Sequence, residues 1–134
     1  MALNLQIGMS KTIDFMVNRE QLASSVGSGT EDVLATPSLI AAMENVAMQL
    51  VAEGLPVGMA SVGVRIEADH IAATPMGMQV KVTATLIEMQ GRKLSFEIEA
   101  FDKREKVGYA KHVRFAIDRT KFQKKADAKL EPIE

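Results

Sequence analysis

The spacing of apolar residues changes once along this sequence, close to Gly58. Upstream, residues 36–53 carry apolar side chains around well over half of a helical circumference, a breadth typical of a buried helix. Downstream, apolar residues recur at every second position, as they do in strands with one buried face. One buried helix followed by consecutive strands predicts an α+β domain whose antiparallel sheet wraps around that helix.

The predicted helix has a clear start and a clear end. Thr36 is expected to be the N-cap, with Pro37 at the first helical position, where its missing N–H costs nothing. Gly54, with Pro56 just beyond it, is expected to stop the helix. The apolar residues of the helix are Leu39, Ile40, Met43, Val46, Ala47, Leu50 and Val51.

Alternating segments predict five strands, one over residues 11–17 and four after the helix. The expected inward positions are Ile13, Phe15 and Val17; Val62, Val64, Ile66, Ala68 and His70; Val80, Val82, Ala84 and Leu86; Leu94, Phe96, Ile98 and Ala100; and Val107, Tyr109, Val113, Phe115 and Ile117. The alternation slips at residues 86–87, which predicts a β-bulge there.

Two segments fall outside this pattern. Residues 18–35 are rich in Ser and Gly and are expected to form a flexible loop with one short helical turn near residues 19–23. Residues 120–134 are expected to be a charged, loosely attached tail of the single domain 1–134. The order of elements is that of the hotdog fold. Because one helix cannot cover five strands and an edge strand stays open, we expect a homodimer paired edge to edge.

The composition excludes several classes of function. Lys and Arg total 16 against 17 Asp and Glu, so no net positive charge attracts nucleic acid or an anionic membrane. The absence of cysteine excludes disulfides, thiolate metal sites and a cysteine nucleophile. No apolar run approaches the ~18 residues that span a bilayer, and the first residues do not resemble a signal peptide. We therefore expect a cytoplasmic protein that binds no metal.

Three polar residues stand where the pattern favours other types. Glu44 lies in the middle of the buried helix, where an unpaired carboxylate is costly. His70 ends a strand on its apolar face, and Thr36 lies where backbone N–H groups converge at the helix start. Each has a plainer interpretation, as a solvated residue, a core histidine and a helix cap respectively. The second histidine, His112, falls on the polar phase of the last strand and is interpreted as a surface residue.

The segment from Ala35 to Leu86 resembles the core of fluoroacetyl-CoA thioesterase-like hotdog proteins. In that family a Thr begins the helix, a Glu follows eight residues later, and a His follows after 26 more. Thr36, Glu44 and His70 reproduce both spacings. The run HIAATPMGMQV is also similar to the family's H-x-AATPxG-x-x-V, and the likeness extends over about residues 11–122.

This resemblance implies an acyl-CoA thioesterase that hydrolyses a small acyl group, with coenzyme A as part of the substrate and no cofactor. It implies catalytic roles for Thr36, Glu44 and His70, and substrate contacts from Gly63 and Arg114. The family's fluoroacetyl-specific enzyme carries lid phenylalanines before the helix, whereas the corresponding segment here, SSVGSGTED, has none. The resemblance therefore extends to the reaction class and not to the fluorinated substrate.

Thr36 and Glu44 lie far apart along the predicted helix. Eight helical residues separate Thr36 from Glu44 by about 12 Å along the axis, too far for direct contact. We therefore expect the site to lie at a dimer interface, where the partner supplies one member. Two alternatives stay open: a dimer that binds or senses acyl-CoA without turnover, and a hotdog hydratase acting on enoyl thioesters.

Overall fold

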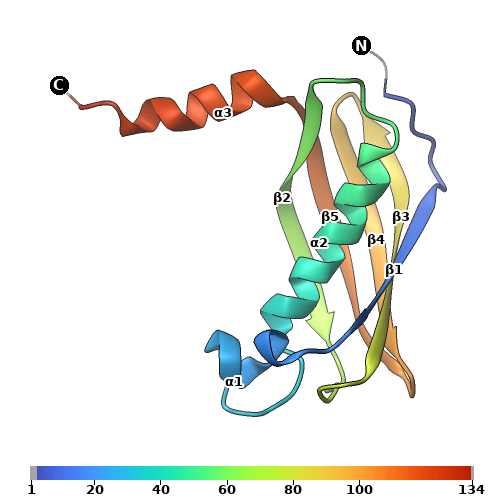
Figure 1. Ribbon diagram of the computed structural model, residues 1–134. Coiled ribbons are helices and arrows are strands. Elements are labelled where there is room, and N and C mark those ends of the chain that lie inside the picture. Colours follow the sequence, from blue (N-terminus) through green and yellow to red (C-terminus); the bar gives the residue numbers. More distant parts are fainter. Residues whose placement is uncertain (1–2, 134) are drawn as a thin grey trace.

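The computed structural model describes residues 3–133 and contains one antiparallel sheet with one long helix packed on it (Figure 1). The strands are β1 (Ser10–Met16), β2 (Met59–His70), β3 (Gln79–Gln90), β4 (Lys93–Asp102) and β5 (Lys106–Asp118), in the spatial order β1-β3-β4-β5-β2. The long helix is α2 (Thr36–Ala52). The predicted architecture of five antiparallel strands around one buried helix is confirmed.

Helix α2 provides the centre of the core. Its inner residues Met43, Val46, Ala47, Leu50 and Val51 are fully buried, as predicted. The start of the helix differs from the prediction by one residue. Ala35 is the N-cap, because its carbonyl accepts the first helical hydrogen bond from the N–H of Leu39, and Thr36 is the first helical residue. The Thr36 hydroxyl therefore does not cap the helix.

Strands β3 and β4 follow the predicted alternation. Their buried residues are Val80, Val82, Ala84 and Leu86 on β3, and Leu94, Phe96, Ile98 and Ala100 on β4. The pairing of β3 with β4 shifts by one residue between Leu86 and Glu88. The bulge predicted from the slip in alternation is confirmed.

Strand β2 contains a second bulge that the alternation does not reveal. Its pairing with β5 shifts between Gly63 and Arg65, and Val64, which lies in the shift, is 55% exposed. The prediction that Val62 and Val64 face the core is therefore wrong; Val62 lies opposite the exposed Phe115, on the face away from α2. Before the bulge Gly63 faces α2, and after it Ile66 and His70 lie on that same side.

The predicted inward face of β5 is also wrong over most of its length. Tyr109 and Phe115 are 44% and 38% exposed, and the buried residues of the strand are Val107, Gly108, Ala110, His112, Arg114 and Ala116. The pairing with β4 shifts between Ala100 and Phe101, opposite the start of β5. That shift reverses which residues face the core, so His112 is a core residue and not a surface one.

The connecting and terminal segments contain short helical elements. The loop before α2 contains the 3₁₀ turn η1 (Arg19–Gln21), which confirms the expected turn, and the short helix α1 (Ala23–Val26). After β5 the chain forms helix α3 (Arg119–Asp127) and the turn η2 (Ala128–Leu130). Every residue of α3 is exposed, and the helix projects away from the sheet (Figure 1). None of the described helices is long and apolar enough to cross a membrane.

Candidate active site

The structure brings together two of the three predicted catalytic residues. Thr36 at the start of α2 and His70 at the end of β2 meet because the helix runs antiparallel to that strand (Figure 1). The Thr36 Oγ1 and His70 Nδ1 atoms are 2.8 Å apart and form a hydrogen bond. Both residues line an open pocket whose other walls include Ala23, Ser28 and Ala72.

The second ring nitrogen of His70 has no hydrogen-bond partner among residues 3–133. Nε2 is buried and makes no hydrogen bond with any described residue. Burial lowers the pKa of His70, and the backbone of Ala72 opposes this shift. The imidazole is therefore neutral at pH 7, with Nδ1 bonded to the Thr36 hydroxyl.

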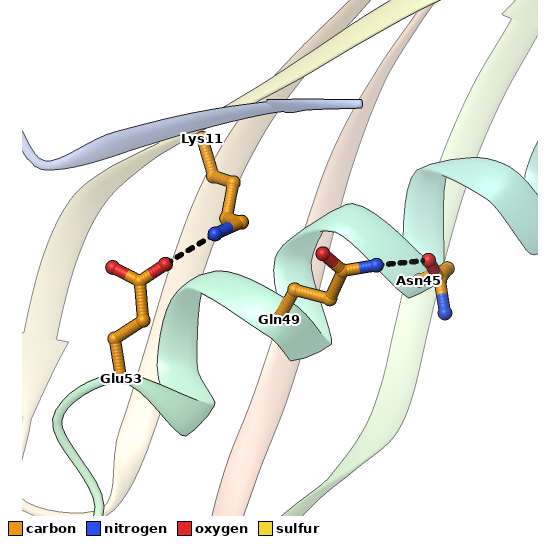
Figure 2. A network of polar contacts seen from close by, with 4 residues as sticks. All are labelled: Lys11, Asn45, Gln49 and Glu53. Carbon is orange, nitrogen blue, oxygen red and sulfur yellow. Dashed lines mark hydrogen bonds and ion pairs between the residues drawn. The ribbon is translucent and has the colours of Figure 1, made fainter. Parts of the chain in front are cut away.

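Glu44 does not belong to the solvated stripe of α2. That stripe is formed by Asn45, Gln49 and Glu53, which follow one another at four-residue spacing on one side of the helix. Gln49 donates a hydrogen bond to Asn45 over 2.7 Å, and Lys11 of β1 pairs with Glu53 (Figure 2). Glu44 precedes Asn45 by about 100° of helical rotation and faces β2 instead.

Glu44 faces a polar cluster formed with Gly63, His112 and Arg114. A side-chain carbon added at Gly63 would lie 2.8 Å from Glu44 Oε2, 3.2 Å from His112 Cε1 and 3.3 Å from Arg114 Nη1. Any side chain at position 63 would therefore displace these groups. We call Glu44, Gly63, His112 and Arg114 the arginine cluster.

Arg114 is fixed within this cluster by Ser61 on the neighbouring strand. Its Nε donates to Ser61 Oγ over 2.8 Å, and its Nη2 donates to the Ser61 carbonyl over 3.0 Å. The residue is only 6% exposed. Burial lowers the pKa of Arg114, and the charge of Glu44 opposes that shift.

Two members of this arrangement, His112 and Ser61, were missed by the sequence analysis. His112 was assigned to the wrong face of β5, although it shares the phase of Arg114 two residues later. That shared phase, together with the small residues Ala110 and Ala116 on the same face, could have indicated that His112 faces the core. Ser61 gave no signal, because only the pairing of β2 with β5 brings it to Arg114.

The Thr36–His70 pair and the arginine cluster remain separate within one chain. The two-turn separation of Thr36 and Glu44 keeps them about 12 Å apart along the helix, and no hydrogen bond between described residues links the two groups. The described residues also contain no cluster of three or more His, Asp or Glu side chains suited to a metal ion.

The fold and its solved relatives define the general class of the protein. A hot-dog-like protein from Thermanaerovibrio acidaminovorans superposes with a TM-score of 0.87 at 20% identity, covering 95% of this chain and 94% of its own. This likeness shows the hotdog fold. The fluoroacetyl-CoA thioesterase FlK superposes with a TM-score of 0.90 at 31% identity, over 96% of this chain and 98% of its own.

Residues 17–120 match the family described as fluoroacetyl-CoA-specific thioesterase. The fluoroacetyl-CoA thioesterase of Streptantibioticus cattleyicolor is 37% identical over 98 residues, which are 73% of this chain and 70% of that protein. The chain belongs to this family. It is an acyl-CoA thioesterase, a thioester hydrolase with the hotdog fold, as the sequence resemblance implied.

Proposed function

We propose that this thioesterase hydrolyses a small acyl-CoA at a site completed by a second copy of the chain. The observation that carries the proposal is the Thr36–His70 hydrogen bond beside an open pocket, with His70 Nε2 bonded to none of the described residues. A neutral, oriented imidazole has one unprotonated ring nitrogen, so it is suited to accept a proton during acyl transfer. CoA enters as part of the substrate, and no cofactor is required.

Each site residue has its own proposed role in thioester hydrolysis. Glu44 and His70 share the role of base or nucleophile, and Thr36 bonds to or attacks the acyl carbonyl. Gly63 leaves space for the acyl group beside Glu44, and Arg114 provides N–H donors to the substrate. The backbone N–H groups in the first turn of α2 are suited to stabilise the oxyanion.

A dimer paired through β2 would unite the two separate groups. Strand β2 is the last strand of the sheet, and its outer edge pairs with no other described strand. In a regular antiparallel pair, the numbers of two facing residues always add up to the same value, and both side chains lie on the same side of the sheet. A twofold axis through Glu67 would therefore pair Ile66 with Ala68 of the partner subunit. The extra residue of the bulge would then bring Gly63 opposite His70 of the partner subunit, next to the arginine cluster.

This assembly would remove an exposed edge as well as complete the site. An unpaired edge strand exposes a row of N–H and C=O groups that favour association. Because the partner's Thr36–His70 pair would then face Glu44, dimerisation becomes a condition of activity. The absence of cysteine fits a reducing compartment, and we propose the cytoplasm as the location.

A panel of acyl-CoAs tests the proposal directly. The protein is incubated with acetyl-CoA, fluoroacetyl-CoA and longer acyl-CoAs, and release of the CoA thiol is followed with a chromogenic disulfide. Release above the uncatalysed rate for short acyl groups is expected. Binding without release would favour the acyl-CoA sensor, and hydration of an enoyl-CoA without release would favour the hydratase.

A matched pair of variants controls for folding. Thr36→Val removes the hydroxyl bonded to His70 with little change in volume, and thiol release should fall strongly. Thr120→Val makes the same change on the exposed surface of α3 and should leave release unchanged. Equal activity of the two variants would contradict the proposed role of Thr36.

A further inference from the structure

His112 is buried in the core with both ring nitrogens in use. It is 1% exposed, and its ring centre lies 6.0 Å from that of Phe96. Nδ1 is 2.7 Å from the backbone carbonyl oxygen of Arg65, which directly follows the bulge of β2. Nε2 is 3.2 Å from Arg114 Nη1. The ring therefore joins β5, the β2 bulge and the Arg114 guanidinium.

These two contacts determine the protonation state of His112. A carbonyl oxygen can only accept a hydrogen bond, so Nδ1 must carry the proton and donate it to Arg65. A guanidinium can only donate, so Nε2 must be the unprotonated acceptor of Arg114 Nη1. His112 is therefore a neutral imidazole in the Nδ1–H form.

Some of the N–H groups of the Arg114 guanidinium take no part in these contacts. A guanidinium carries five N–H groups, and Ser61 Oγ, the Ser61 carbonyl and His112 Nε2 each accept from one of them. The remaining two have no hydrogen-bond acceptor among the described residues. Because Gly63 has no side chain, the space next to Nη1 stays free on the side that also borders Glu44.

We propose that His112 is a positioning residue for substrate binding. As a neutral acceptor it holds Arg114 in the orientation in which the two remaining N–H groups bind the acyl-CoA. Ser61 alone fixes one edge of the guanidinium, and His112 fixes Nη1, which lies nearest to Gly63. The inference rests on the proposed substrate contact of Arg114 and extends it to a residue that does not touch the substrate.

The arrangement makes substrate binding sensitive to acid. Protonation of Nε2 would replace the acceptor with a donor and place a positive charge 3.2 Å from Arg114 Nη1, which would displace the guanidinium. The charged groups facing His112 are Glu44 from α2 and Arg114 from β5; β2 contributes the carbonyl of Arg65, and β4 contributes an uncharged ring.

Burial has the largest effect and lowers the pKa of His112. Arg114 adds to that shift, whereas the Arg65 carbonyl and Glu44 oppose it. Substrate affinity should therefore be constant near neutral pH and should weaken only as the pH falls below about 6.5, the ordinary histidine value.

Two substitutions separate positioning from simple core packing. His112→Asn keeps an N–H near the position of Nδ1, so it retains the bond to Arg65 and loses the acceptor for Arg114. His112→Gln reaches the position of Nε2, so it retains an acceptor for Arg114 and loses the bond to Arg65. If His112 only filled the core, both changes would lower the free energy of unfolding, Asn more than Gln because it leaves the larger cavity, and neither would change Kd while the protein stays folded.

The test measures binding by calorimetry, so it does not depend on turnover. The probe is a non-hydrolysable acetyl-CoA analogue with a methylene group between the sulfur and the carbonyl carbon. At pH 7.5 we expect His112→Asn to raise Kd roughly tenfold, the usual size of a hydrogen bond to a charged group, and His112→Gln to stay within about twofold. Wild-type Kd should rise below pH 6.5, and that of the Gln variant should rise less, because only His70 of the two histidines remains.

A double variant shows whether His112 acts through Arg114. Arg114→Lys should raise Kd, and adding His112→Asn to it should raise Kd no further, because residues acting as a unit are not additive. Wild-type affinity in His112→Asn or in Arg114→Lys, or a Kd of the wild-type protein that is independent of pH, would overturn the proposal. Normal binding without thiol release would instead contradict the proposed function and leave the positioning role intact.

Discussion

Gly63 and His70 face the same side of the sheet, although they are an odd number of positions apart on β2. Regular alternation would place such residues on opposite faces. The shift between Gly63 and Arg65 removes one step of the alternation, so both residues lie on the side of α2. The bulge therefore allows one strand to supply both the glycine proposed to contact the acyl group and the proposed catalytic histidine.

The first prediction tests whether the site is shared between subunits. A heterodimer of a Glu44→Gln chain and a His70→Ala chain should regain activity, because one of its two sites would contain both native residues. A random equal mixture should then show about a quarter of wild-type activity, since half of the dimers are mixed and each has one intact site. Activity no higher than that of the two parent variants would place both residues in the same subunit.

The second prediction concerns the two residues separately. Glu44→Gln and His70→Ala should each remove at least ~2 kcal/mol of transition-state stabilisation, a loss of roughly 30-fold in kcat/KM, while the protein stays folded. The double variant should cost little more than either single change, because the residues act as a unit. Near-native turnover in either folded variant would eliminate this mechanism.

The third prediction uses the absent side chain at position 63. Gly63→Ala would bring a methyl group to 2.8 Å from Glu44 Oε2, closer than carbon and oxygen atoms approach. We expect kcat/KM to fall by about tenfold or more, because Glu44 and Arg114 must move apart. Gly29→Ala, in the loop before α2 and without a positive φ, is the control; its added carbon would lie 3.3 Å from Ala23 Cβ, and kcat/KM should fall far less than in Gly63→Ala. Unchanged kinetics in Gly63→Ala would show that the cluster tolerates displacement.

The fourth prediction concerns stability in acid. The pKa values of His70 and His112 are both lowered, mainly by burial, so the unfolded chain binds protons that the folded chain does not. The free energy of unfolding should therefore be greatest above about pH 6.5 and should decrease as the pH falls toward the folded-state pKa values. Urea denaturation at pH 7.5 and 5.5 measures this loss. It should be smaller in His112→Gln, and an identical loss there would exclude His112 as a contributor.

The fifth prediction concerns substrate selectivity. Ala23 and Ser28 line the pocket of the Thr36–His70 pair, and residues 24–32 include no aromatic side chain to cover it. A loosely covered pocket discriminates weakly between acyl groups. Acetyl-CoA and fluoroacetyl-CoA should therefore differ by no more than about tenfold in kcat/KM beyond their intrinsic reactivity, or ~1.4 kcal/mol. A corrected preference of a thousandfold or more for fluoroacetyl-CoA would refute this interpretation of the loop.

The elements of the fold could be predicted from local patterns. The breadth of the apolar surface of α2 indicated burial, and Met43 and Leu50 are indeed inaccessible to solvent. The inward residues of β3 and β4 follow simple alternation, and the bulge after Leu86 is visible because the apolar phase slips there. In these segments, periodicity and burial have the same cause, namely the contact of one face with the core.

The composition of the site depends on features that no local pattern contains. The bulge at Val64 and the shift at the start of β5 arise from pairing with a neighbouring strand, and each reverses which residues face α2. A one-residue change in register moves every later side chain to the other face, so His112 was predicted at the surface and lies in the core.

The sequence by itself determined that one buried helix lies on five antiparallel strands, and it identified Thr36, Glu44 and His70 as candidates. Only the tertiary structure decided that Thr36 bonds to His70, while Glu44 joins Gly63, His112 and Arg114. The reason is physical. Periodicity records which residues avoid water, whereas the contacts of polar side chains depend on strand register, and register is set by hydrogen bonds between segments far apart in the chain.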